Sequence, residues 1–258
     1  MQSRPDTDGP RDAHGFLLAQ GFPEGDAGLM VEIDVLMDAL GIGLPAMKDS
    51  AGRALSSLAA RRYFGGEVTG RRIAVLAGKG GNGDIALLSA RRLADWGADV
   101  TVCLSAEAGA LGPGPAREVA ILSRLGRTVA RDLPAGPDLI LDGLVGYSLR
   151  GAPRGRVAEL VRAANTSGVP ILSLDMPTGF DAQDGLVRDP AIRADATLSL
   201  GLPKRGLTSQ AFAHVVGALY VGDIMIPPEA WGRLSRKLTV PAFGPESVLR
   251  ILRSGEII

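Results

Sequence analysis

Residues 73–97 read IAVLAGKGGNGDIALLSARRLADWG, and this stretch decides the fold. An apolar run over 73–77 ends in a glycine-rich loop, which opens into an amphipathic helix predicted over 84–96. In α/β proteins this order of strand, loop and helix places backbone N–H groups and a helix N-terminus against a phosphate. The loop lacks the GxGxxG pattern, and Ile85 stands where a binding site would carry a polar group. A turn that only lets the helix pack closely on the strand is therefore an alternative.

The same alternation of apolar runs and helical patterns continues along the chain. Further strands are predicted over 99–105, 138–146, 170–175, 196–200 and 218–224. Further helices are predicted over 29–40, 46–63, 115–126 and 155–168. Continuous apolar strands separated by helices indicate an α/β protein whose mostly parallel sheet is covered on both faces.

The N-terminal residues differ in composition from the rest of the chain. Residues 1–27 are rich in glycine, proline and aspartate, and we predict a disordered or loosely attached leader there. No internal repeat or low-complexity linker interrupts the remainder. Residues 28–258 are therefore expected to form a single domain.

The overall composition argues against several classes of protein. The 28 basic residues balance the 28 acidic ones, which gives no electrostatic reason to expect nucleic acid or a membrane surface as partner. No apolar segment approaches the roughly 20 residues that span a bilayer, and the N-terminus lacks the order of a secretory signal. Cys103 is the single cysteine, lies in an apolar run, and is expected to be a buried structural thiol. We expect a cytoplasmic protein.

Unusual polar and glycine-rich segments follow four of the predicted strands. They are the loop 78–84, Asp142 with its following loop, Asp175 with its following loop, and the segment ending in Lys204. Because parallel strands end at one edge of a sheet, these segments are expected to meet in one ligand site. Each also has a simpler interpretation. An aspartate at a strand end can cap a turn or helix, and a lone lysine can be a solvated loop charge.

The ordered set of motifs resembles the YjeF N-terminal family, the NAD(P)H-hydrate epimerases. The family patterns DxxxGTGL, DIPSGxDxxxG, ADxTVxFGxPKxG and GxLxVxDIGIP resemble LILDGLVGYSLRG, PILSLDMPTGFDAQDG, RADATLSLGLPKRGL and GALYVGDIMIP in this chain. The segment MVEIDVLMDALGIGLPAMKDSAGRAL is similar to the family's opening helix and its LMENAGR motif. The resemblance covers about residues 29–228.

Membership of this family would imply a fold, an activity and a partner. The fold is a Rossmann-like three-layer α/β/α sandwich with a mostly parallel sheet, often in a homodimer. The activity is interconversion of the R and S forms of hydrated NADH and NADPH (NADHX and NADPHX), a metabolite repair reaction. The functional partner is a separate NAD(P)H-hydrate dehydratase, which repairs only one epimer.

The resemblance also assigns roles to single residues. Asn82, Asp142 and Thr178 stand at positions that bind a potassium ion in the family, and their oxygen donors suit a hard cation. Asp175 aligns with an aspartate that contacts the substrate, and it is our candidate for the acid/base. The implied substrate-binding residues are Gly81, Asn82, Gly83, Asp84, Gly146, Tyr147, Ser148, Leu149, Arg150, Gly151, Ala152 and Lys204.

The glycine-rich loop departs from the family pattern. The family's GPGNNGGDG becomes GKGGNGDIA, so Gly81 replaces the first asparagine and Ile85 replaces the aspartate. A shift by one residue would bring Asp84 into the missing role. A non-catalytic nucleotide-binding or scaffold module with a degenerate phosphate loop therefore stays an alternative to the enzyme. An NAD-dependent dehydrogenase is disfavoured, because 100–104 carries no acidic residue that would hold a ribose.

Overall fold

The structure, a computed structural model, describes residues 9–254 and Glu256. Nine strands form one sheet in the order β1-β11-β10-β9-β6-β5-β2-β3-β4. Every neighbouring pair from β10 to β4 is parallel, and β11 runs antiparallel to β10. The strands of the sheet are β1 (Leu18–Ala19), β2 (Arg72–Ala77), β3 (Asp99–Leu104), β4 (Thr128–Ala130), β5 (Leu139–Gly143), β6 (Ile171–Leu174), β9 (Ala196–Leu200), β10 (Ala218–Gly222) and β11 (Val248–Ile251). A separate hairpin joins β7 (Phe180–Asp181) and β8 (Leu186–Val187).

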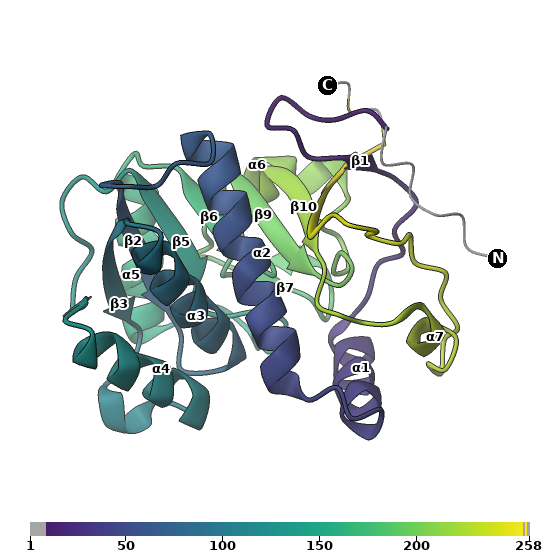
Figure 1. Cartoon of the computed structure of the whole chain (residues 1–258), viewed down its shortest axis with the longest axis horizontal. Helices are drawn as coiled ribbons and strands as arrows, with labels where there is room; N and C mark the ends of the chain where they lie inside the picture. Colours follow the sequence, from purple (N-terminus) through teal and green to yellow (C-terminus); the bar gives the residue numbers. More distant parts are fainter. Residues whose placement is uncertain (1–8, 255, 257–258) are drawn as a thin grey trace.

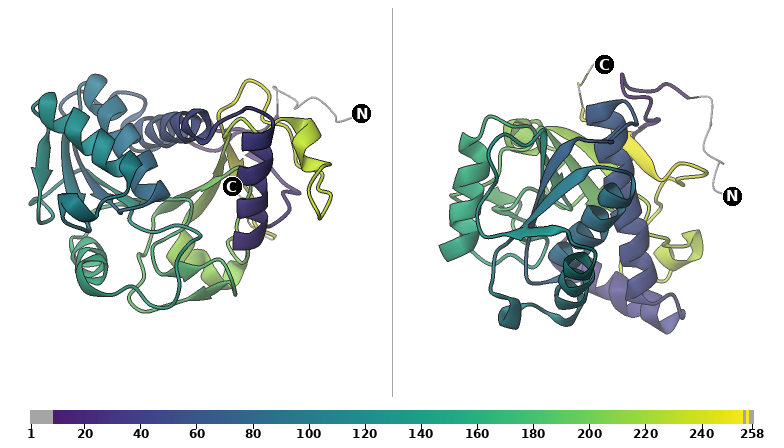
Figure 2. Two further views of the ribbon diagram at one scale, coloured as in Figure 1. Left: turned by 90° about the horizontal axis from the view of Figure 1, so that it is seen from below. Right: turned by 60° about the vertical axis from the view of Figure 1, so that its left-hand side comes forward.

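Helices cover both faces of this sheet. They are α1 (Ala27–Ala39), α2 (Leu44–Phe64), α3 (Gly81–Asp95), α4 (Pro113–Arg124), α5 (Gly155–Thr166) and the short α6 (Ala213–Val216) and α7 (Pro228–Trp231). Figure 1 shows α2, α3 and α4 in front of the sheet and α5 behind it, and the view from below in Figure 2 shows helices on either side. The predicted three-layer α/β/α sandwich with a mostly parallel sheet is confirmed.

The strand order contains a point at which the winding of the sheet reverses. From β2 the chain passes outward through β3 and β4, then returns to β5 on the other side of β2 and continues to β6, β9 and β10. Ligands of open α/β sheets bind at such a switch point, beyond the carboxyl ends of the strands. The segments that follow β2 and β5 therefore occupy the position where this fold builds a ligand site.

The prediction of a loosely attached leader over 1–27 is wrong for the part that the structure describes. Phe16 is fully buried, its ring centroid lies 5.2 Å from that of Tyr220, and the Arg61 guanidinium lies 4.0 Å from the Phe16 ring centroid. β1 pairs with β11, and the Tyr220 hydroxyl donates to Asp12 at 2.7 Å. Aromatic burial and a strand partner from the far end of the chain hold these residues. Residues 1–8 of the predicted leader lie outside the described residues.

Several element boundaries also differ from the sequence prediction. α3 begins at Gly81 instead of residue 84, so the loop after β2 is only Gly78, Lys79 and Gly80. The predicted strand 138–146 ends at Gly143, because the chain turns away from the sheet there. The edge strands β1 and β4, the strand β11 beside β1, and the hairpin β7–β8 were not predicted.

The hydrophobic core follows from the apolar strands. All residues of β5, β6 and β9 are buried, as expected for central parallel strands with helices on both faces. The apolar side chains form two clusters. The larger extends from Phe16 to Ile251 and includes side chains of α1, α2 and α3, whereas the smaller joins side chains of α5 to those of β2 and β5. Cys103 is buried as predicted, and burial raises the pKa of its thiol to about 11, so the thiolate that reacts is scarce at neutral pH.

We expect Phe16→Ala to lower the free energy of unfolding by about 3–5 kcal/mol, because it leaves a cavity under Tyr220 and Arg61. Urea denaturation measures this change. Leu125→Ala is the matched control: Leu125 is 53% exposed on the end of α4, and its loss should change stability by less than about 0.5 kcal/mol. Equal stability of the two variants would mean that the N-terminal segment is not part of the core.

Candidate active site

A cavity of about 230 Å³ lies between the carboxyl edge of the sheet and the helices α1 and α2. Its floor comes from the sheet and the start of α3, whereas its other walls come from the two helices. Most of its lining is apolar, and the polar side chains are few, which is typical of a small-molecule site. The lining residues are Met30, Asp34, Leu44, Met47, Lys48, Ala51, Gly81, Asn82, Ile85, Tyr147, Asp175, Leu200, Lys204 and Ile224.

The central feature of this cavity is a buried ion pair. Asp175 follows β6 directly, and Lys204 follows β9, the next strand in the sheet. Lys204 Nζ lies 2.6 Å from Asp175 Oδ1, and the two side chains are 0% and 1% exposed. The interpretation of Lys204 as a solvated loop charge is therefore wrong. Each charge needs the other, because an unpaired buried charge would cost several kcal/mol.

Lys204 is held rigidly by backbone acceptors and by the N-terminal segment. Its Nζ donates to the carbonyl of Leu200 at 2.7 Å and of Leu202 at 3.3 Å, so two backbone carbonyls fix the ammonium beside Asp175. Gly25 pairs with Lys204 in a parallel bridge. Glu24 accepts hydrogen bonds from the backbone N–H of Gly206 and of Thr208. Residues of the predicted leader thus fix the loop that carries the lysine.

Asp175 has an unusual backbone and an underused carboxylate. Its φ is +68°, a left-handed conformation that costs a non-glycine residue about 1–2 kcal/mol. Its N–H donates to the Leu198 carbonyl at 2.6 Å, which ties this turn to β9. Within the described residues, neither carboxylate oxygen accepts a geometrically sound hydrogen bond, although Lys204 lies close by. Strain and unused acceptors at a cavity wall are features of functional sites.

A second cavity, of about 770 Å³, adjoins the first at the switch point of the sheet. The two cavities share Gly81, Asn82 and Tyr147. The larger one is lined by the loop after β2 and by the segment after β5, including the sequence-predicted residues Gly146, Tyr147, Ser148, Leu149 and Arg150. The first N–H groups of α3 have no intrahelical acceptor and face this region, which makes it suitable for an anion.

Two glycines explain how strand and helix approach each other here. A Cβ on Gly83 would lie 1.8 Å from the Gly78 carbonyl oxygen, and a Cβ on Gly78 would lie 1.8 Å from the Leu144 carbonyl oxygen. Both positions therefore exclude every side chain. The close-packing interpretation of the glycine-rich loop is correct for these two residues, and the loop also lines the larger cavity through Lys79, Gly80 and Gly81.

Asp142, near the end of β5, lines neither cavity and is held in a closed hydrogen-bond network. Its carboxylate accepts from the Thr178 hydroxyl at 2.7 Å, the Thr178 N–H at 2.8 Å, the Ser173 hydroxyl at 2.9 Å and the Leu144 N–H at 3.3 Å. Burial raises the pKa of this carboxyl, and the four donors partly oppose that shift. The network ties the ends of β5 and β6 to the loop that follows Asp175.

The predicted potassium ligands provide an all-oxygen donor set. Asn82 Nδ2 donates to the Leu174 carbonyl at 3.1 Å, which orients the amide, and Gly146 leaves room for the amide oxygen, since a Cβ there would lie 2.4 Å from it. An amide, a hydroxyl and one carboxylate suit a hard monovalent cation. Asp142 already holds four hydrogen bonds, the usual capacity of a carboxylate, so a cation bound there would displace one of them.

Some sequence-predicted residues lie apart from the two cavities. Asp84 is buried on the side of α3 that faces α4, where it forms a 2.8 Å ion pair with Lys48. Successive residues turn by about 100° around a helix, so Asn82 and Ile85 share the cavity side and Asp84 does not. The shifted alignment therefore does not bring Asp84 to the ion pair. Gly151 and Ala152 line neither cavity.

Sequence reasoning missed two charged residues of the smaller cavity. Asp34 projects from α1 and accepts a hydrogen bond from the Tyr147 hydroxyl at 3.0 Å, and Lys48 lines the cavity from α2. The only signal for Asp34 was its place one turn after Met30 and next to Ile33, on the apolar side of a helix. Helix α1 itself was predicted, but its acidic residues were assigned no role.

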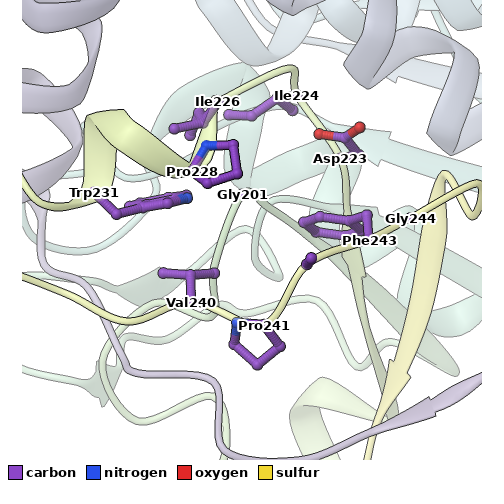
Figure 3. A pocket seen from close by; sticks show the side chains of 11 residues that line it. Gly201, Asp223, Ile224, Ile226, Pro228, Trp231, Val240, Pro241, Phe243 and Gly244 are labelled. Atoms are coloured by element: carbon purple, nitrogen blue, oxygen red, sulfur yellow. The ribbon is translucent and has the colours of Figure 1, made fainter. Parts of the chain in front are cut away.

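A third cavity, of about 180 Å³, lies beyond the ends of β9 and β10 (Figure 3). Its lining is mainly apolar, with Trp231 and Phe243 on different sides and the carboxylate of Asp223 at its margin. Burial raises the pKa of Asp223. Ile224 lines this cavity and the 230 Å³ cavity and separates the two.

Comparison with known proteins identifies relatives over most of the chain. Residues 46–206 match the profile of a family described as YjeF-related protein N-terminus. A protein of Dehalogenimonas lykanthroporepellens named NAD(P)H-hydrate epimerase is 39% identical over 216 residues, which are 81% of this chain and 84% of the relative. A protein of the same name from Truepera radiovictrix is 36% identical, over 72% of this chain and 82% of the relative.

Other relatives are longer, and one similar fold is known from a crystal. A bifunctional NAD(P)H-hydrate repair enzyme Nnr of Hyperthermus butylicus is 33% identical, over 77% of this chain but only 37% of the relative. The crystal structure of the yeast protein ynu0 superposes with a TM-score of 0.72 at 23% identity and covers 88% of this chain and 99% of that one. The latter likeness supports the fold alone. Among the described residues, no helix is long and apolar enough to cross a membrane.

We expect Lys204→Met to lower the free energy of unfolding by about 3–5 kcal/mol at neutral pH, because it leaves the Asp175 carboxylate buried without its partner. Urea denaturation measures the loss. The double variant Asp175→Asn with Lys204→Met should recover most of it, since both charges are then absent. Lys237→Met, at an exposed position, is the control and should be neutral within about 0.5 kcal/mol. A single variant as stable as this control would contradict the pairing.

Proposed function

This chain belongs to the family of YjeF-related protein N-termini, and we propose that it is an NAD(P)H-hydrate epimerase. The reaction interconverts the R and S forms of hydrated NADH and NADPH. The observation that carries the proposal is the buried Asp175–Lys204 pair at the wall of a cavity that adjoins a helix N-terminus. A strained, water-excluded carboxylate beside an anion-binding surface is suited to proton transfer on a ring attached to a dinucleotide.

The sizes of the two cavities match the two parts of such a substrate. The cavity of about 230 Å³ is smaller than the roughly 300–1,000 Å³ of sites that enclose a drug-sized ligand, so it would take the hydrated nicotinamide ring alone. The larger cavity would take the ribose and phosphate groups, with the pyrophosphate at the start of α3. Lys79 and Arg150 line this cavity and supply positive charge.

The acid/base chemistry follows from the ion pair. The hydroxyl at ring carbon C6 leaves as water when it receives a proton, while the lone pair of the ring nitrogen forms a C=N bond. Water then adds back to the cation and returns a proton. Asp175 is proposed to carry this proton at its Oδ atoms, and Lys204, 2.6 Å away, orients the carboxylate. Because Lys204 is fully buried beside Asp175, orientation is a better role for it than a phosphate contact.

A potassium ion is proposed at Asn82, Asp142 and Thr178. When bound, it would supply positive charge next to the substrate phosphates. The support is the oxygen chemistry of the three side chains and the position of Asn82 where the two cavities meet.

The proposed partner is a separate NAD(P)H-hydrate dehydratase. The bifunctional relative from Hyperthermus butylicus is considerably longer than the segment that this chain matches. We propose that a second repair activity resides in the rest of such relatives and acts on the product of the epimerase. A homodimer and a cytoplasmic location remain predictions.

A non-catalytic nucleotide-binding module is the second candidate function. The cavity of about 230 Å³, proposed above for the nicotinamide ring, is called the ring cavity below. Ile85 lines it without a polar group, and Gly81 offers no side chain, which favours this alternative. The costly burial of Asp175 and Lys204 favours the enzyme, since a binding module would have no use for a carboxylate held in strain.

We expect the protein to epimerise the R form of NADHX faster than the spontaneous reaction, as measured with an excess of a dehydratase specific for the S form. Asp175→Asn should lower the rate by at least about 100-fold, which is the usual contribution of a general acid/base. Asp184→Asn, an exposed carboxylate on the same loop, is the control and should keep full activity. Rates of the wild-type protein equal to the spontaneous rate would leave only the binding module.

We expect potassium to stimulate the reaction, and sodium to do so less. Thr178→Val removes the hydroxyl and should raise the potassium concentration for half-maximal activity by about 10-fold or more, because altered metal sites typically lose 10–100-fold in affinity. Thr178→Ser keeps the oxygen and is the matched control. A potassium response that is the same in both variants would remove Thr178 from the proposed ligands.

A further inference from the structure

The ring cavity contains a second carboxylate that the reaction described above does not use. Asp34 lies on α1, outside the sheet, whereas Asp175 lies at the carboxyl end of β6. Both side chains line the same cavity, but they enter it from different layers of the fold. Asp34 is half-buried, and the Tyr147 hydroxyl donates a hydrogen bond to its Oδ2 at 3.0 Å.

The surroundings of Asp34 suit a group that exchanges a proton. Burial is the strongest influence and raises the pKa of Asp34, and the negative charge of Asp175 acts in the same direction. The Tyr147 hydrogen bond and the positive charges of Lys204 and Lys48 oppose the shift. These are the charged and titratable groups that face Asp34 from α2, from the segment after β5 and from the ends of β6 and β9.

Inversion at C6 places a demand on the site that one carboxylate does not meet. The oxygen leaves from one face of the ring, and in the other epimer it stands on the opposite face. A carboxylate at one wall can protonate and deprotonate oxygen only on the face that it contacts. A second proton carrier is therefore needed at another wall of the cavity, and Asp34 is the carboxylate available there.

We propose that Asp34 is the second acid/base of the epimerase and serves the face of the ring turned away from Asp175, with Tyr147 as its positioning residue. This inference rests on the proposed function. In one direction Asp175 gives a proton to the C6 hydroxyl, the C–O bond breaks, and water leaves as the ring nitrogen forms the C=N bond. A water molecule on the other face then forms the new C–O bond, the C=N electrons return to nitrogen, and Asp34 takes up the proton. Asp34 then releases its proton to solvent and Asp175 takes one up from solvent, which restores the starting state. The reverse direction exchanges the two roles, so atoms and charge balance.

Tyr147 connects this carboxylate to the substrate-binding segment. It stands where the family pattern GTGL has threonine, in the sequence GYSL of this chain. A phenol reaches farther than a threonine hydroxyl, and here it extends from the segment after β5 to α1. Because Tyr147 lines both cavities, it holds Asp34 at the junction between the ring and the rest of the dinucleotide.

The variant Asp34→Asn is expected to fold, which allows a direct test. Since folding raises the pKa of Asp34, the wild-type protein loses stability as pH rises through that pKa, relative to its stability below the unfolded value of 3.8. Asparagine does not ionise and still accepts the Tyr147 hydrogen bond. Asp34→Asn should therefore be at least as stable as the wild type at pH 7, and its advantage should shrink as pH falls towards 4. Urea denaturation at the two pH values measures this.

The test follows oxygen exchange and inversion separately. Each epimer of NADHX is incubated in H₂¹⁸O with wild-type protein, Asp34→Asn, Asp175→Asn or Tyr147→Phe. The two epimers are then separated, and mass spectrometry measures the ¹⁸O content of each. The rates of the uncatalysed reaction are subtracted. The control is Asp38→Asn, an exposed carboxylate one turn farther along α1, which should behave as the wild type. The wild type should both invert and label each epimer.

In Asp34→Asn, inversion should fall at least 100-fold. One epimer should still take up ¹⁸O with its C6 configuration retained, because Asp175 still catalyses exchange of the hydroxyl on its own face of the ring. In Asp175→Asn, the opposite epimer should exchange. Tyr147→Phe should retain partial activity, and its pH–rate profile should shift to higher pH, because the hydrogen bond that lowers the pKa of Asp34 is lost. Wild-type inversion in Asp34→Asn, or loss of exchange in both epimers alike, would overturn the inference and leave the epimerase intact. Absence of inversion in the wild type would instead remove the proposed function itself.

Discussion

The burial of two opposite charges at one edge of the sheet is the constraint on which the site depends. Asp175 and Lys204 are stable there only as a pair, and neither strand end can move without separating them. The fold meets this constraint with local devices: backbone carbonyls around the ammonium, a left-handed turn at the aspartate and a clamp from Glu24 and Gly25. The same devices keep water away from the carboxylate, so structural rigidity and chemical reactivity have one origin.

The alternation of strands and helices could be predicted because local sequence patterns indicate each element. Central parallel strands such as β5 and β9 are continuous apolar runs, and the helices between them have apolar positions at helical spacing. The edge of the sheet could not be predicted in this way. β1 has only two residues and pairs with β11 from the far end of the chain, so its order comes from tertiary contacts that no local window contains. Phe16, in a segment rich in glycine and aspartate, is buried for the same reason.

The candidate site, too, could be predicted where sheet topology places a residue but not where tertiary contacts do. Asp175 and Asn82 meet because the carboxyl ends of parallel strands share an edge, and this topological rule is visible in the sequence. The burial of Lys204 depends on its partner on a neighbouring strand, and a lone lysine gives no sign of that. Asp34 was missed because an acidic residue in a helix is normally solvated, and Asp84 was misplaced because two residues along a helix reverse the direction of a side chain.

The position of β11 between β10 and β1 determines an order of assembly. β1 has no place in the sheet until β11 has added to β10, so the first strand of the chain is the last to be incorporated. Contacts of such long sequence separation form slowly. Until then β10 presents an unpaired edge, which is an opportunity for pairing with another molecule. Incorporation of β1 therefore depends on β11, and pairing of the β10 edge with another molecule is the step at which aggregation competes with folding.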